Sequence, residues 1–334
     1  MPHPPRYDGP IAPARPAMTD SAAPTTADAQ LAQADAVHDT DPGRALALLR
    51  NLDAAALSPA RQPRLAFLVD HVLGEKFALW GEALAELRAL VRLAGDAVSP
   101  AVLRHAAVAA QVAGDAAQAA TWTQALADAG AAPVAKARAL VALGIVGFTA
   151  GRLAAGDAGR AALRALEPLD DLHAAPADGL DPAFGAVTNN LASDLLERPV
   201  EDLTDDALCH ALQAAAAHAQ RFWARAGTWL NHERAHYLVA MAANALGDGA
   251  TGIAQARAGL ALLDAHDTAG DEQVDRAFLE LELAMGLRLA GQDGRGDALA
   301  RALALAARFG NPDLDRWFAG RHTRNEALAV HYGK

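Results

Sequence analysis

Apolar residues recur along this chain with the spacing of amphipathic helices, in stretches that end at short runs of Gly, Asp and Pro. Ala and Leu fill most of the apolar positions, whereas runs of β-branched and aromatic residues, which strands use, are scarce. Alanine is the strongest helix former. The pattern therefore predicts an all-α protein, whose small side chains require the helices to approach one another closely.

The turns mark where each predicted helix ends. After a first short helix that ends at Asp41-Pro42, the expected helices cover residues 45–57, 64–79, 82–95, 102–113, 116–130, 135–150, 154–169, 183–197, 206–223, 229–246, 252–266, 274–290 and 298–310. A turn is also expected at Trp80-Gly81, and the longest break covers residues 171–182. Recurring pairs of antiparallel helices are typical of a helical solenoid, in which the stacking of pairs buries faces that one pair leaves exposed.

Residues 140–168 carry the clearest repeat-like pattern. Leu143-Gly144 lie midway along a first helix, Gly151 marks the turn, Gly156 is a small residue early in the second helix, and Pro168 ends it. Similar positions recur at Asn189-Asn190-Leu191-Ala192, at Ala240, Gly247-Asp248, Gly252 and Gly259, and at Ala284, Gly291 and Gly296. In this pattern the chain resembles the tetratricopeptide repeat family over roughly residues 40–310. The resemblance implies an α-α superhelix that binds a protein or peptide in its concave groove, although the period here is looser than the family's.

Three segments are expected along the chain. Residues 1–27 are rich in Pro, Ala and Thr without periodicity and are expected to be disordered, and Met18 is an alternative start to Met1. Residues 28–310 form the predicted repeat domain. Residues 311–334 form a predicted capping tail, in which Trp317 and Phe318 dock on the last helix pair because the end of a solenoid must be covered.

Charge and composition limit the partners and the compartment. A formal net charge of −11 argues against a nucleic-acid-binding surface. The single cysteine, Cys209, excludes an intramolecular disulfide and suits a reducing compartment. We find no secretory signal and no apolar run of the roughly 20 residues that cross a membrane. We therefore expect a cytoplasmic protein, and its Ala-rich, Lys-poor composition indicates a GC-rich bacterial genome.

Polar residues on the first helices of successive pairs are the candidate binding residues, because these helices line the concave face of such a solenoid. When the turn glycines set the register, nine residues are expected to face the concave side: Arg104, His105, Arg138, Asn189, Asn190, Arg234, Tyr237, Glu282 and Arg288. Arginine suits carboxylates, and asparagine can hold a peptide backbone; the family resemblance makes Asn190 the best candidate for that contact. The predicted partner-binding residues are Arg104, Arg138, Asn189, Asn190, Arg234, Tyr237 and Arg288, and the alternative is that they are ordinary solvated positions.

The stretch Arg221–Tyr237 contains a possible metal-binding motif, which would indicate an enzyme instead of a binding protein. His232 and His236 are four residues apart on a predicted helix, with Glu233 as a possible general base, which is the pattern of zinc peptidases. Zinc peptidases of this kind usually have uncharged residues between the Glu and the second His, and Arg234 departs from that pattern. A third zinc ligand would have to be Glu272, Glu280 or Glu282, and none of them lies in a recognisable motif. The simpler interpretation is a junction between two helix pairs, with a turn at Gly227-Thr228 and the tryptophans filling the joint.

The sequence thus favours a non-enzymatic scaffold or adaptor that binds a protein partner or an acidic peptide and needs no cofactor. A zinc-dependent metallopeptidase built on His232 and His236 is the alternative from another class. A peptide-sensing regulatory module is a second alternative. No motif identifies the partner or the oligomeric state.

Overall fold

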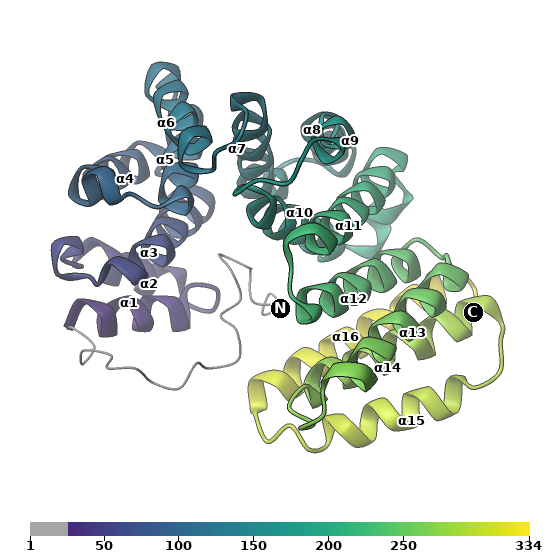
Figure 1. Cartoon of the computed structure of the whole chain (residues 1–334). Coiled ribbons are helices and arrows are strands. Elements are labelled where there is room, and N and C mark those ends of the chain that lie inside the picture. The colour runs from purple at the N-terminus through teal and green to yellow at the C-terminus, as the bar shows by residue number, and fades with distance from the viewer. Residues whose placement is uncertain (1–25) are drawn as a thin grey trace. The chain divides into compact units, whose positions relative to one another are not determined.

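The computed structural model describes residues 26–334, which form helices and turns and contain no β-strand. The predicted all-α class is confirmed for this part of the chain. Nearly all of the segment expected to be disordered lies outside the described residues. The described chain divides into two compact units (Figure 1). The N-terminal unit comprises residues 26–152 and Ala174–Val187, and the C-terminal unit comprises Leu153–His173 and Thr188–Lys334.

The N-terminal unit contains one π-helix among α-helices and short 3₁₀ turns. Its helices are α1 (Thr26–Val37), α2 (Pro42–Arg50), α3 (Gln62–Leu68), the π-helix η3 (Val69–Lys76), α4 (Trp80–Ala94), α5 (Pro100–Val112), α6 (Ala116–Ala129) and α7 (Val134–Thr149). Its 3₁₀ turns are η1 (Ala54–Ala56), η2 (Pro59–Arg61), η4 (Gly95–Ala97) and η5 (Ala150–Arg152).

The C-terminal unit also consists of α-helices and a short 3₁₀ turn, and most of its helices are longer. They are α8 (Ala155–Leu166), α9 (Leu169–Ala174), the 3₁₀ turn η6 (Val200–Thr204), α11 (Asp206–Ala226), α12 (Trp229–Ala245), α13 (Gly249–His266), α14 (Gln273–Ala290), α15 (Arg295–Ala306) and α16 (Pro312–His331). α10 (Asp181–Leu196) begins in the N-terminal unit and ends in the C-terminal one. The short helix α9 lies in the region expected to be a loop.

The Gly-Asp turns fix where several helices begin. Gly247 ends α12 with a φ of 78°, in the left-handed region that glycine adopts without strain. Asp248 then caps α13 by accepting a hydrogen bond from the Thr251 amide at 3.0 Å. Asp115 caps α6 in the same way, accepting from the Gln118 amide at 3.1 Å.

Helices that are neighbours in sequence pack as pairs within each unit. α5 packs on α6 in the N-terminal unit, and α12 to α15 pack successively in the C-terminal unit. First helices of neighbouring pairs also contact each other, α5 with α7 and α12 with α14. One pairing departs from sequence order, because α8 packs on α11, with α9 and α10 between them in the chain. Both units therefore contain helical hairpins.

Glycines let paired helices approach more closely than any larger residue allows. A Cβ on Gly249 of α13 would lie 2.5 Å from the Gly286 carbonyl oxygen of α14. A Cβ on Gly159 of α8 would lie 2.3 Å from the Leu208 amide nitrogen of α11. Both distances are well below van der Waals contact, which agrees with the close helix approach expected from the sequence.

The segment expected as one helix over residues 64–79 has a different form. α3 ends at Leu68 and continues as the π-helix η3, and a turn with Ala78 at a φ of 58° precedes α4. α4 begins at Trp80, where the sequence had predicted a turn, and the Trp80 ring packs directly on Gly74 of η3. π-Helices are rare and are frequently found at functional sites.

α16 occupies the region predicted as a capping tail. Its Trp317 and Phe318 rings lie 4.3 and 5.4 Å from the ring of Phe278 on α14. Phe309 also packs edge-on against Phe318 at 5.9 Å. These aromatic contacts attach α16 to α14.

Within the described residues, one stretch, Val134–Arg152, is long and apolar enough to cross a membrane, with a mean hydropathy of 1.5. Half of that apolar window is buried inside the protein. It also carries Lys136, a buried lysine whose ammonium pairs with Asp178 at 2.8 Å and with Asp181. A buried core helix meets the same criteria, so this helix alone does not indicate a membrane protein.

Candidate functional site

The seven predicted partner-binding residues divide between the two units and differ in accessibility. Arg138 is exposed on α7, and Asn190 is half-buried on α10. Asn189 and Arg104 are buried, and the Arg104 guanidinium lies 3.0 Å from Nε2 of His105. A partner can therefore reach Arg138 directly, whereas it reaches Asn189 or Arg104 only if neighbouring side chains move.

Arg234 and Tyr237 on α12 point toward the first part of α14. Arg234 Nε donates to Asp275 Oδ2 at 2.8 Å, and its Nη2 lies 3.6 Å from Glu272 Oε2. The Tyr237 ring packs on Phe278 with centroids 6.0 Å apart, and no group in residues 26–334 hydrogen-bonds to its buried hydroxyl. In this arrangement two carboxylates already compensate Arg234, and Tyr237 is a packing residue.

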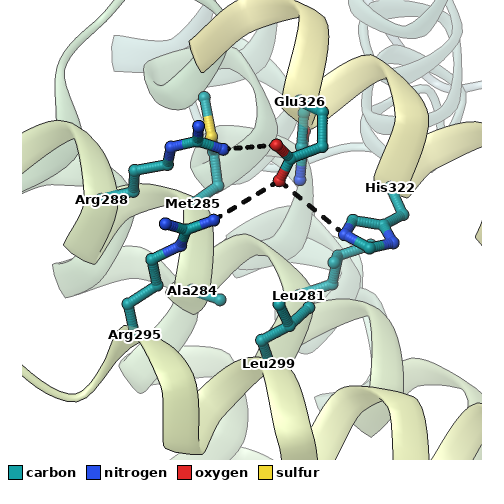
Figure 2. Close-up of a pocket in the computed structure, with 9 residues that line it drawn as sticks. Leu281, Ala284, Met285, Arg288, Arg295, Leu299, His322 and Glu326 are labelled. Atoms are coloured by element: carbon teal, nitrogen blue, oxygen red, sulfur yellow. Dashed lines mark hydrogen bonds and ion pairs between the residues drawn. The ribbon is translucent and has the colours of Figure 1, made fainter. Parts of the chain in front are cut away.

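Arg288 lines a small pocket between α14, α15 and α16 (Figure 2). Its apolar lining residues are Leu281, Ala284, Met285 and Leu299. Three basic side chains converge on the Glu326 carboxylate, as Figure 2 shows. Arg288 Nη1 lies 2.7 Å from Glu326 Oε2, and Arg295 Nη2 and His322 Nε2 lie 3.6 and 3.9 Å from Oε1.

The electrostatics of this pocket favour negative charge. The hydrogen bond from Arg288 is the main reason that the pKa of Glu326 lies below its usual value. Arg288 Nη2 also donates to a main-chain oxygen of Lys334 at 3.0 Å, which fixes the guanidinium. Arg288, Arg295 and His322 surround the Glu326 carboxylate, so a carboxylate that replaced Glu326 would meet the same basic groups.

The stretch Arg221–Tyr237 forms the predicted junction, between the end of α11 and the start of α12. Thr228 caps α12 through a capping box with Asn231, so the chain turns at Gly227-Thr228. Trp223 is buried, and Trp229 stacks on His266 with centroids 5.3 Å apart. The tryptophans thus pack at the ends of the two helices.

The His-Glu-x-x-His residues are held by their surroundings rather than by one another. His236 Nδ1 lies 2.7 Å from Gln255 Oε1, and His232 Nε2 is buried without a hydrogen-bond partner among residues 26–334. Glu233 is fully buried; burial, followed by the nearby Asp275 carboxylate, raises the pKa of Glu233 to about 9. A carboxyl group that is neutral at pH 7 is a poor general base. In the described part of the chain this motif belongs to no group of three ligand side chains close enough to share a metal ion.

Glu282, which the sequence predicted to face the groove, is instead fully buried, at the centre of a polar network that the sequence interpretation did not identify. Glu282 of α14 accepts hydrogen bonds from Arg321 and Asn325 of α16 and from Asn244 of α12, at 2.7, 3.1 and 2.8 Å. The signal of this network in the sequence is the pair Glu280 and Glu282, which interrupts the otherwise apolar stretch 277–287 of α14. The network links three helices in the interior of the C-terminal unit.

Residues 26–334 contain one group of three potential metal ligands, made by His38, Asp39 and His71 in the N-terminal unit. The sequence interpretation missed it because His71 and Asp39 are 32 residues apart and lie in different elements. No local spacing pattern could have joined them.

No protein-family model matches the chain, and no curated protein matches it.

Proposed function

We propose that the protein is a non-enzymatic scaffold of tetratricopeptide-like helix pairs that binds an acidic segment of a protein partner. The observation that carries this proposal is the pocket of α14, α15 and α16, where Arg288, Arg295 and His322 surround the single carboxylate of Glu326. The contacts of α5 with α7 and of α12 with α14 support helix pairs that are stacked through their first helices.

Glu326 occupies the position that a partner carboxylate would take. Its side chain is 47% exposed, so it can move into solvent without leaving a buried cavity. An incoming Asp or Glu side chain, or a chain terminus, would then accept the hydrogen bonds of Arg288 and the charge of Arg295. The apolar residues that line the pocket, among them Leu281 and Met285, would contact the aliphatic part of the ligand.

An array of synthetic peptides of varied charge tests this proposal. We expect the untagged protein to retain Asp- and Glu-rich peptides preferentially, with binding that weakens as salt concentration rises. The double variant Arg288→Ala/Arg295→Ala should bind the same peptides at least about tenfold more weakly, since charge-assisted hydrogen bonds are lost. Arg308→Ala, which removes an exposed arginine just after α15, is the matched control. A lack of preference for acidic peptides, or an equal loss in the control, would contradict the proposal.

The same array examines the residues that the sequence predicted on α10 and α12. If the groove predicted from the sequence also contacts the peptide, Asn190→Ala and Arg234→Ala will weaken binding without changing helical content, as measured by circular dichroism. Unchanged affinity in both variants would confine the binding surface to the pocket of α14, α15 and α16.

A further inference from the structure

The side chains of His38, Asp39 and His71 lie at the distances that metal ligands require. His71 Nε2 is 3.3 Å from Asp39 Oδ1, and His38 Nε2 is 3.3 Å from Asp39 Oδ2. One ligand atom from each residue lies within 4.8 Å of the other two. Two atoms bound to a tetrahedral Zn²⁺ at about 2.0–2.1 Å are roughly 3.3 Å apart. A cation therefore fits among these side chains with small adjustments.

Hydrogen bonds on the far side of both imidazoles leave Nε2 as the atom that faces Asp39. His71 Nδ1 lies 2.6 Å from Glu75 Oε2, and His38 Nδ1 hydrogen-bonds to the backbone carbonyl of Asp35. A carboxylate or carbonyl that accepts from Nδ1–H is the usual outer partner of a metal-bound histidine, because it fixes the tautomer and the ring orientation. Both histidines have such a partner before any ion is bound.

An aromatic ring holds the two imidazoles in place. Phe67, which is fully buried, stacks on His71 with centroids 5.3 Å apart and an interplanar angle of 10°. The same ring meets His38 edge-on at 6.2 Å. The exposed fraction of the His71 side chain is 1%, and η3, the π-helix that carries it, is buried from Val69 to Gly74. Ligands fixed in this way lose little conformational entropy when an ion binds.

The local charge also favours a cation. Asp39 and Glu75 bring two carboxylates to the site, and Lys76 is a basic neighbour whose Nζ lies 3.7 Å from Asp39 Oδ1. Arg64 is compensated separately, because its Nε donates to Asp35 at 2.9 Å. The immediate ligand shell thus has a negative excess, with Lys76 as a competitor for Asp39.

We infer that His38, Asp39 and His71 bind one divalent transition-metal ion, with Zn²⁺ as the preferred ion and Glu75 as the outer partner of His71. Two imidazoles and one carboxylate suit zinc or ferrous iron rather than magnesium or calcium, which take oxygen ligands. Three protein ligands leave a coordination position for water or a further ligand. His38 and Asp39, at 15% and 23% side-chain exposure, leave the ion a path from solvent. The ion would join the connection between α1 and α2 to the π-helix η3.

Zinc titration of the untagged, chelator-treated full chain tests this inference. Isothermal titration calorimetry with Zn²⁺ should give one ion per chain, with a dissociation constant of about 1 μM or below, and the melting temperature should rise with zinc. Co²⁺ should give a visible absorption band that Zn²⁺ abolishes. Asp39→Asn and His38→Gln change partly exposed side chains and leave the buried His71 ring in place, and each should weaken zinc binding at least about tenfold. Glu75→Gln should weaken it about tenfold, because His71 loses its outer partner. Lys76→Met should tighten binding, since the competing ammonium is removed.

The double variant His232→Gln/His236→Gln is the matched control, because it removes the two histidines of the zinc-peptidase pattern, which lie in the other unit. It should bind zinc as the unmodified protein does. Absence of stoichiometric zinc binding would overturn the inference. So would an affinity of Asp39→Asn and His38→Gln equal to that of the unmodified protein, or loss of the ion in the control variant. The acidic-peptide proposal is untouched by these outcomes, since its residues lie on α14, α15 and α16.

Discussion

Arg321 of α16 and Glu282 of α14 form an ion pair inside the C-terminal unit, with Nε of Arg321 2.7 Å from Oε1 of Glu282. The two side chains are 5% and 0% exposed. Burial by itself lowers the pKa of Arg321, but the Glu282 carboxylate outweighs it, so the pKa lies above the ordinary value. The C-terminal helix is thus attached to α14 by a buried charge pair as well as by the aromatic contacts of Trp317 and Phe318.

Replacing one partner of this pair should destabilise the protein strongly. Arg321→Met leaves the Glu282 carboxylate buried without its charge partner, which typically costs about 3–5 kcal/mol of unfolding free energy. Urea unfolding followed by circular dichroism measures the change. Arg316→Met, on the same helix, is the matched control; its ion pair with Asp313 is 66% and 80% exposed, and its loss should cost less than about 0.5 kcal/mol. Equal losses of unfolding free energy in the two variants would show that the buried pair contributes no more to stability than the exposed pair.

Glu233 should make stability fall as pH rises through neutrality. Its pKa is raised to about 9 in the folded protein, above its ordinary value of 4.5. Between these pH values the unfolded carboxyl loses its proton while the folded one keeps it, so the unfolded state binds fewer protons and the free energy of unfolding decreases with pH. Glu233→Gln removes this dependence and should stabilise the protein by roughly 1–3 kcal/mol at about pH 7 to 8, with little effect near pH 4.

Thermal unfolding of both forms over a series of pH values checks this sign. Asp293→Asn, which changes an exposed carboxylate in the turn before α15, is the control and should leave the curve nearly unchanged. A stability difference between Glu233→Gln and the unmodified protein that does not vary with pH would contradict the prediction.

The helices and several of their turns could be predicted from the sequence because the signals are local. Gly247 and Asp248 end one helix and cap the next through contacts within four residues, so composition and spacing were sufficient there. The π-helix η3 gave no such signal, since its sequence reads as the continuation of α3. Gly74 of this π-helix packs against the Trp80 ring, and such a tertiary contact cannot be predicted from local sequence.

The candidate sites likewise depend on contacts between residues far apart in the sequence, which no local pattern predicts. His232 and His236 drew attention because four-residue spacing is visible in the sequence, whereas His38 and His71 are brought together only by folding. Arg234 was expected to face a groove, but the carboxylates of Asp275 and Glu272 that compensate it come from a later helix and the turn before it. Arg288 does line a pocket, although its acidic neighbour Glu326 comes from the segment expected to be a tail.

Two glycine-to-alanine substitutions in the C-terminal unit should have opposite signs. A Cβ on Gly159 would lie 2.3 Å from the Leu208 amide nitrogen, and the backbone of α11 cannot yield without separating α8 from α11. Gly159→Ala should therefore destabilise the protein by about 1–3 kcal/mol. Gly320, inside α16, has nothing within 4 Å of its Cβ position, so Gly320→Ala should stabilise by roughly 0.5–1 kcal/mol through helix propensity alone. Urea unfolding measures both, and hydrogen exchange should show the loss of protection in Gly159→Ala centred on α8 and α11. A stabilising Gly159→Ala would mean that the close approach of these two helices is not required by the fold.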